Sequence, residues 1–134
     1  MKFQPDTNAS GNVISRRETD ALWVNGERHA GSLVVPWRGA VRPWSAQGFA
    51  LLAAADFEQL LAWKPELVLF GSGARLHFAA PALYRCLIDA RIGLETMDNA
   101  AACRTFNVLA SEGRSVLAAL LRGSEPGSEP GAAP

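Results

Sequence analysis

The chain has 134 residues, of which 49% are hydrophobic and 19% are charged, and this composition predicts one folded domain with a substantial core. Thirteen basic residues balance thirteen acidic ones, so no overall positive charge draws the chain to nucleic acid or to an anionic membrane. No apolar run approaches the roughly 18 residues of a membrane-spanning helix. We therefore predict a soluble protein that binds neither nucleic acid nor membrane.

The two cysteines, Cys86 and Cys103, fall in segments predicted to be helical. Neither they nor the two histidines stand at the spacing of metal ligands. The N-terminus lacks the pattern of a secretory signal or of an organelle transit peptide. We therefore predict reduced thiols, a cytoplasmic location, and neither a metal nor another cofactor.

The two ends of the chain differ from its middle in composition. Residues 1–12 are polar and rich in turn formers, and we expect a loose N-terminal lead-in there. Residues 123–134 repeat Gly-Ser-Glu-Pro and contain no large apolar residue, so burial cannot offset their loss of conformational entropy. The sequence predicts a disordered tail over 123–134 and a single α/β domain over 13–122.

The first half of this domain has the pattern of short strands. Residues 22–24 precede Asn25-Gly26, the dipeptide best suited to a tight hairpin turn because both positions tolerate positive φ. Residues 32–37 resume the strand pattern, with Pro36 suited to a strand end or edge, and a third short piece surrounds Val41. These signals predict a β meander of three or four strands.

The second half alternates helix and strand. Asp56 is a plausible N-cap, and a second helix is expected to begin at Pro81, face Ile88 inward and end before Gly93. Asp98 is expected to cap a third helix over residues 99–111. The expected strands are 67–70, which is continuously apolar, then 93–97 and 116–121. Strands separated by helices in this way predict a mixed, largely parallel central sheet in an α/β fold.

Four segments of the second half have an uncommon sequence, and in chain order they are 69–73 (LFGSG), 92–98 (IGLETMD), 102–109 (ACRTFNVL) and 111–114 (SEGR). Together they resemble a known family of small domains, mostly of unknown function, that includes the mitochondrial respiratory complex I assembly factor three and the adipogenesis-associated domain protein. Ser72 and Asn99 stand where the family usually has threonine, and both keep a small hydrogen-bonding side chain. The resemblance implies a three-layer single domain: a central mixed sheet with helices and an added N-terminal β meander.

The loop Gly71-Ser72-Gly73 is the first candidate ligand site. It follows a buried strand, and α/β sheets tend to bind ligands at the carboxyl ends of their strands, where glycines let backbone amides approach an anion. Neither a phosphate-binding Walker loop nor a dinucleotide-binding glycine motif is present. A tight turn that takes the chain out of the sheet is the alternative interpretation.

The polar face of the third helix is the second candidate. Arg104, Asn107 and Ser111 are spaced by three and four residues, so they share one side of the helix, and Asp98 lies at its start. Arginine and asparagine donors could hold a carboxylate or a phosphate. A solvated helix face explains the same pattern, and Asp98 is better explained as a cap than as a catalytic base.

Two further residues carry open alternatives. Cys103 could be a nucleophile near a helix start, but no histidine is close in sequence and its place at the edge of the apolar face favours an inert buried thiol. Trp44 lies in a proline-rich turn and could be an exposed anchor for a partner.

The family resemblance, together with the lack of a complete catalytic constellation, favours a non-enzymatic protein-binding or assembly-assisting module with a protein partner. The alternative is a small-molecule domain or weak enzyme that binds an anionic ligand with the 71–73 loop, Arg104 and Asn107. A homodimer formed through an exposed edge strand is also consistent with the predicted meander.

Overall fold

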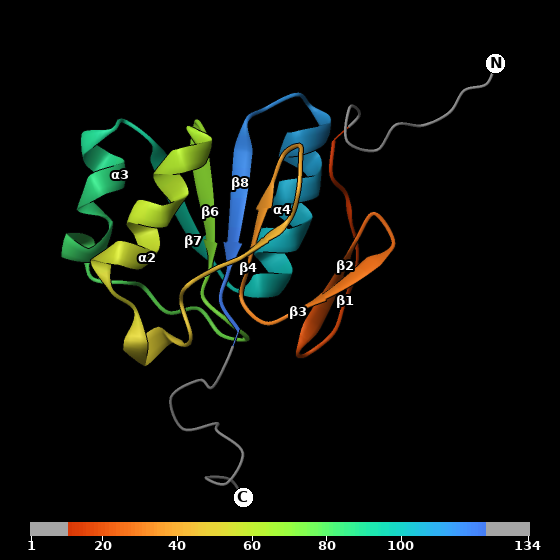
Figure 1. Ribbon diagram of the computed structural model, residues 1–134, viewed down its shortest axis with the longest axis horizontal. Helices are drawn as coiled ribbons and strands as arrows, with labels where there is room; N and C mark the ends of the chain where they lie inside the picture. Colours follow the sequence, from red (N-terminus) through yellow and green to blue (C-terminus); the bar gives the residue numbers. More distant parts are fainter. Residues whose placement is uncertain (1–10, 123–134) are drawn as a thin grey trace, which may run out of the picture.

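The structure is a computed structural model that describes residues 11–122. The predicted tail at 123–134 and residues 1–10 of the predicted lead-in lie outside the described residues. The described strands form two sheets, one of five strands in the order β5-β4-β8-β6-β7 and one of three in the order β1-β2-β3 (Figure 1).

The five-stranded sheet combines parallel and antiparallel pairs. β6 (Leu67–Gly71) runs parallel to both of its neighbours, β7 (Gly93–Met97) and β8 (Val116–Leu120). β8 pairs antiparallel with β4 (Leu33–Pro36), which also pairs antiparallel with the short β5 (Arg42–Pro43). All of β8 and all but the first residue of β6 are buried, as their continuously apolar sequences predict. The predicted mixed sheet is confirmed.

The three-stranded sheet is an antiparallel meander. It consists of β1 (Ile14–Arg17), β2 (Ala21–Val24) and β3 (Glu27–Ala30). Asn25 and Gly26 connect β2 to β3 with φ values of 54° and 85°, which confirms the predicted hairpin. β1 gave no strand signal in the sequence because three of its four residues are polar and exposed.

The elements are arranged in three layers (Figure 1). α4 (Asn99–Ser111) and the three-stranded sheet cover one face of the five-stranded sheet, and α2 (Ala54–Glu58) and α3 (Arg85–Asp89) cover the other. Three short 3₁₀ turns complete the described elements: η1 (Phe49–Leu51), η2 (Gln59–Trp63) and η3 (Pro81–Tyr84). Among residues 11–122, no helix is long and apolar enough to cross a membrane.

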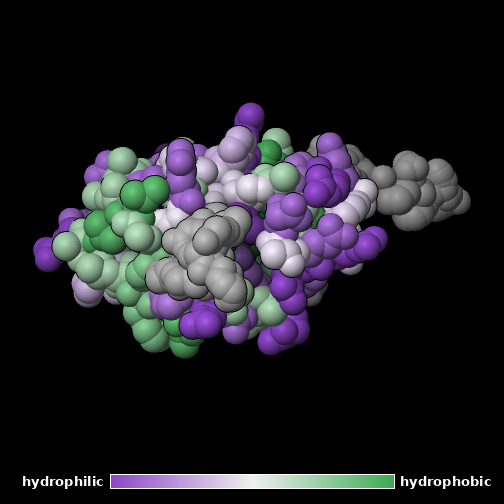
Figure 2. All heavy atoms as spheres, turned by 90° about the horizontal axis from the view of Figure 1, so that it is seen from below, coloured by the Kyte–Doolittle hydropathy of each residue, from purple (hydrophilic) through white to green (hydrophobic). Residues whose placement is uncertain are grey.

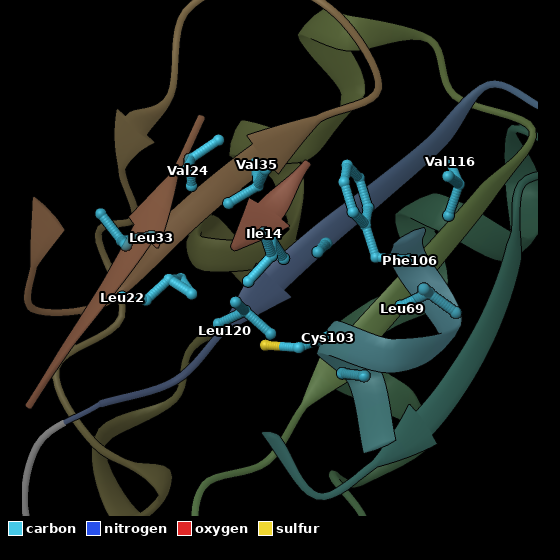
Figure 3. Close-up of a cluster of buried hydrophobic side chains, with 12 residues drawn as sticks. Ile14, Leu22, Val24, Leu33, Val35, Leu69, Cys103, Phe106, Val116 and Leu120 are labelled. Atoms are coloured by element: carbon cyan, nitrogen blue, oxygen red, sulfur yellow. The ribbon is translucent and has the colours of Figure 1, made fainter. Parts of the chain in front are cut away.

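Each face of the five-stranded sheet has its own apolar core. On the α4 side, Phe106 and Cys103 from the helix meet Leu22 of the three-stranded sheet and Leu120 of β8 (Figure 3). This cluster fixes the three-stranded sheet beside α4, because both contribute side chains to it. Alternate residues of β6 and β8 point to the opposite face, where they pack against α2, η2 and α3.

Trp44 belongs to this second core. Its side chain is only 4% exposed, and its ring meets Phe57 and Phe70 edge to face at centroid distances of 5.8 and 5.9 Å. The indole N–H donates to the backbone carbonyl of Asp56 at 2.8 Å, so the polar atom of the ring is satisfied inside the protein. The hypothesis that Trp44 is an exposed partner anchor is therefore wrong, because the chain turns inward directly after β5.

The predicted third helix over 99–111 is confirmed, but three predictions for the first two helices are wrong. α2 begins two residues before Asp56, whose carboxylate accepts from the backbone N–H of Ala53 at 2.9 Å, so Asp56 caps from inside the first turn and is not the N-cap. Gly93 is the first residue of β7, and the left-handed residue after α3 is Arg91, with φ 61°. Ile88 was predicted to face inward but is 54% exposed, because α3 is short and packs mainly through Leu87.

Two polar side chains near the ends of the described segment tie distant parts of the domain together. The amide of Asn12 is buried and donates to the backbone carbonyl of Pro36 at 2.9 Å. Arg122 is also buried, and its guanidinium group donates to the backbone carbonyls of Glu18 and Thr19 in the turn after β1 and of Ala21 at the start of β2. Arg122 thereby links the end of β8 to the three-stranded sheet.

Candidate functional site

The 71–73 loop is closed by its own hydrogen bonds. The Ser72 hydroxyl donates to the backbone carbonyl of Arg75 at 2.7 Å and accepts from the backbone N–H of His77 at 2.9 Å. The Ser72 N–H donates to the carbonyl of Met97 at 2.9 Å, and the Gly73 N–H donates to the side-chain oxygen of Asn99 at 3.2 Å. The amides that could approach an anion therefore already have acceptors within the domain.

Gly71 is required for close packing at the same place. A Cβ atom at this position would meet the side-chain oxygen of Asn99, and a methyl carbon of Leu120 at 2.7 Å. Asn99 is itself buried, and its amide nitrogen donates to the carbonyl of Leu121 at 2.9 Å. Asn99 thus joins the ends of β6 and β8 to the start of α4, which accounts for the glycine and for a small polar residue at position 99.

The residues on the polar side of α4 have different roles. The Asp98 carboxylate accepts from the backbone N–H of Ala101 at 2.8 Å, which confirms the predicted N-cap. The Ser111 hydroxyl donates to the carbonyl of Val108 at 2.7 Å, a bond within the last turn of the helix. The Asp98 cap stabilises the start of α4, whereas the Ser111 hydroxyl makes only a local bond at its end.

Asn107 makes two bonds to the three-stranded sheet. Its side-chain oxygen accepts from the backbone N–H of Ile14 at 2.8 Å, and its amide nitrogen donates to the Ile14 carbonyl at 2.9 Å. The two residues are 93 positions apart in the chain. The Asn107 side chain therefore binds the backbone of β1 in the way a neighbouring strand would. Its oxygen and its nitrogen both have partners within the domain.

Arg104 lines a cavity of about 200 Å³ between β1 and α4. Its lining contains apolar and polar residues of both elements, namely Ile14, Ser15, Arg16, Arg17, Ala100, Cys103, Arg104 and Asn107. No residue of the 71–73 loop is among them, so the structure brings Arg104 and Asn107 together but does not bring the loop to the same cavity. The arginines of β1 were missed as candidates, and the only sequence signal for them was the pair Arg16-Arg17 ahead of the predicted hairpin.

Cys103 is among the residues that line the cavity and is buried. Burial raises the pKa of its thiol, and the positive charges of Arg17, Arg122 and Arg104 act in the opposite direction without overcoming burial. A thiol with a raised pKa remains protonated at neutral pH and is a poor nucleophile. This supports the inert alternative for Cys103.

The described residues also include an exposed apolar surface at the other end of the molecule. Its large members are Leu51 in η1, 69% exposed, and Leu76 and Phe78 in the segment after the 71–73 loop, 50% and 70% exposed. The rings of Phe49 and His77 lie 5.1 Å apart, which places the two segments side by side. Figure 2 shows apolar side chains gathered at the end that carries α2 and α3, whereas the end with the three-stranded sheet is mostly hydrophilic. We call Leu51, Leu76 and Phe78 the apolar surface.

No group of three or more histidine, cysteine or acidic side chains in residues 11–122 is placed to hold a metal ion.

The family model for a protein of unknown function, DUF498/DUF598, matches residues 14–121, which is nearly all of the described domain. The chain belongs to the DUF498/DUF598 family. It is 38% identical over 107 residues to an uncharacterised protein of Rhodobacter capsulatus, covering 80% of each chain. It is 31% identical over 100 residues to the bovine NADH dehydrogenase [ubiquinone] 1 alpha subcomplex assembly factor 3, covering 73% of this chain and 54% of that protein.

The fold is similar to that of solved structures. The crystal structure of a Bordetella parapertussis protein matches with a TM-score of 0.79 and 34% identity, covering 88% of this chain and 99% of that one. The family resemblance inferred from the four sequence segments is confirmed, and so is its link to a complex I assembly factor.

Proposed function

We propose that this DUF498/DUF598 domain is a non-enzymatic protein-binding module that assists the assembly of other proteins, and that it binds its partner through the apolar surface. The relationship to proteins named as assembly factors supports an assembly role. The exposed apolar surface is the observation that carries the proposed binding mode.

The apolar surface is suited to contact with another protein. Single large apolar side chains are common on protein surfaces. A contiguous patch of several such side chains is typical of an interaction site. Phe78 and Leu51 project from 3₁₀ and irregular segments, and the closed 71–73 loop lies just ahead of Leu76, which limits movement of that segment. Phe78 is the candidate anchor of this surface, because an aromatic side chain that fills a pocket on the partner contributes strongly to binding.

The polar residues of the candidate site favour this function over catalysis. Ser72, Asp98 and Asn107 make hydrogen bonds inside the domain, and the thiol of Cys103 is buried.

Cys86 and Cys103 are both free thiols, which supports our proposal of a reducing, cytoplasmic location.

The test is affinity isolation from the native host with three forms of the chain. The double variant Leu51→Ser/Phe78→Ser removes the centre of the apolar surface, and Val108→Ser is the matched control, since Val108 is 55% exposed but lies on α4. We expect one or more proteins to be enriched by the wild-type chain and by the Val108 variant and lost with the double variant. Equal recovery with all three forms, or no enrichment with the wild-type chain, would contradict the proposal.

A further inference from the structure

The cavity between β1 and α4 concentrates positive charge in a chain whose net charge is zero. Of its three arginines, Arg16 is paired with Glu18 at 3.1 Å and also lies over the ring of Trp23, 4.7 Å from its centroid. Arg17 and Arg104 form no ion pair within the described part of the chain. Two uncompensated positive charges therefore face one small cavity.

Arg17 and Arg104 come from different elements but line the same cavity. Arg17 is the last residue of β1, and Arg104 lies in the second turn of α4. No local sequence pattern indicates this arrangement, because the two arginines come to the same cavity only when Asn107 binds the edge of β1.

The lining is suited to a tetrahedral oxyanion. Each guanidinium group presents several N–H donors in a planar fork that matches phosphate oxygens. Ala100, in the first turn of α4, forms part of the lining beside the two arginines. The walls are fixed, since the Asn107 amide is bonded to Ile14 on both its atoms.

The cavity is small and open to solvent. About 200 Å³ is less than the roughly 300–1,000 Å³ of sites for drug-sized molecules. We propose that the cavity between β1 and α4 binds the phosphate group of a small molecule, either inorganic phosphate or a small phosphomonoester, between the guanidinium groups of Arg17 and Arg104. This site is separate from the apolar surface and does not depend on the proposed assembly role.

The test is a titration of the full chain with inorganic phosphate, followed by calorimetry and by amide chemical shifts in NMR spectra. We expect saturable binding, with the largest shifts at residues 15–17 and 100–104. Arg17→Gln and Arg104→Gln should each weaken binding by about tenfold or more, because each removes a charged hydrogen-bond donor. Arg28→Gln is the matched control, since Arg28 is an exposed arginine of the same three-stranded sheet that does not line the cavity.

Titrations with two further ligands define the class of ligand that the site binds. Glycerol phosphate that binds more tightly than inorganic phosphate would assign the site to a phosphomonoester, and the reverse order would assign it to the free anion. Succinate, a dianion of different shape, should bind at least tenfold more weakly than phosphate. Melting temperatures of the variants establish that each is folded.

Three results would overturn the proposal: no saturable binding, affinities of the Arg17 and Arg104 variants that match that of the Arg28 variant, or succinate binding equal to phosphate binding. The Leu51→Ser/Phe78→Ser chain should bind phosphate like the wild-type chain, so failure of either proposal is distinguishable from failure of the other.

Discussion

Asn107 allows a direct test of whether the polar side of α4 has a structural role. The substitution Asn107→Ala removes two hydrogen bonds, of 2.8 and 2.9 Å, that hold β1 against the helix. Each such bond contributes about 1 kcal/mol net, and the backbone N–H and C=O of the buried Ile14 lose their side-chain partner. Water can enter from the adjoining cavity, which limits the cost of leaving these groups unpaired. We expect a loss of about 2–3 kcal/mol in the free energy of unfolding.

The assay is urea unfolding followed by tryptophan fluorescence, supported by amide hydrogen exchange in β1. For a domain of this size the melting temperature should fall by roughly 8–12 °C. Exchange should accelerate most in the three-stranded sheet, because Asn107 fixes that sheet to the rest of the domain.

The matched control is Ser111→Ala on the same side of the same helix. The Ser111 hydroxyl bonds only within its own turn, so this change should alter stability by less than about 0.5 kcal/mol. If Asn107→Ala is as stable as Ser111→Ala, the structural account of the polar side of α4 is refuted.

Three further predictions concern other parts of the domain. Gly71→Ala should destabilise the fold by about 1–3 kcal/mol in urea unfolding, since an added methyl group has no space there; a neutral effect would contradict the packing at the end of β6. The Ser115 N–H and the neighbouring Arg114 ion pair hold the pKa of Glu66 below its ordinary value of 4.5, so Glu66 stabilises the fold above that pH and the contribution is lost as pH falls through the lowered value. NMR titration of Glu66 should show the lowered pKa, and a normal value would contradict the ion pair. Alkylation of the native chain should modify the half-buried Cys86 before the buried Cys103, and the opposite order would contradict the assigned burial.

The features that the sequence predicted most accurately are those determined by residues adjacent in the chain. The turn at Asn25-Gly26 and the cap at Asp98 depend on a few adjacent positions, and both are confirmed. The burial of β6 on both faces followed from its continuously apolar sequence, and it is confirmed as well.

The parts that were not predicted depend on contacts between distant segments. Asn107 and Ile14 are 93 residues apart, so no local pattern distinguishes this asparagine from one on a solvated helix face. The sequence indicated an exposed Trp44 because it follows a proline. The ring is buried because the chain after β5 packs against α2, where the indole N–H binds the Asp56 carbonyl. The cavity that holds Arg17 and Arg104 exists only once β1 lies against α4.

The central claim is that the apolar surface binds a protein partner. The most direct measurement is the dissociation constant between the purified chain and the protein captured with it, for the wild-type chain and for Phe78→Ser. An aromatic side chain at the centre of an interface contributes about 2 kcal/mol or more, so we predict an affinity about 30-fold weaker for the variant. An unchanged dissociation constant for Phe78→Ser would contradict the claim.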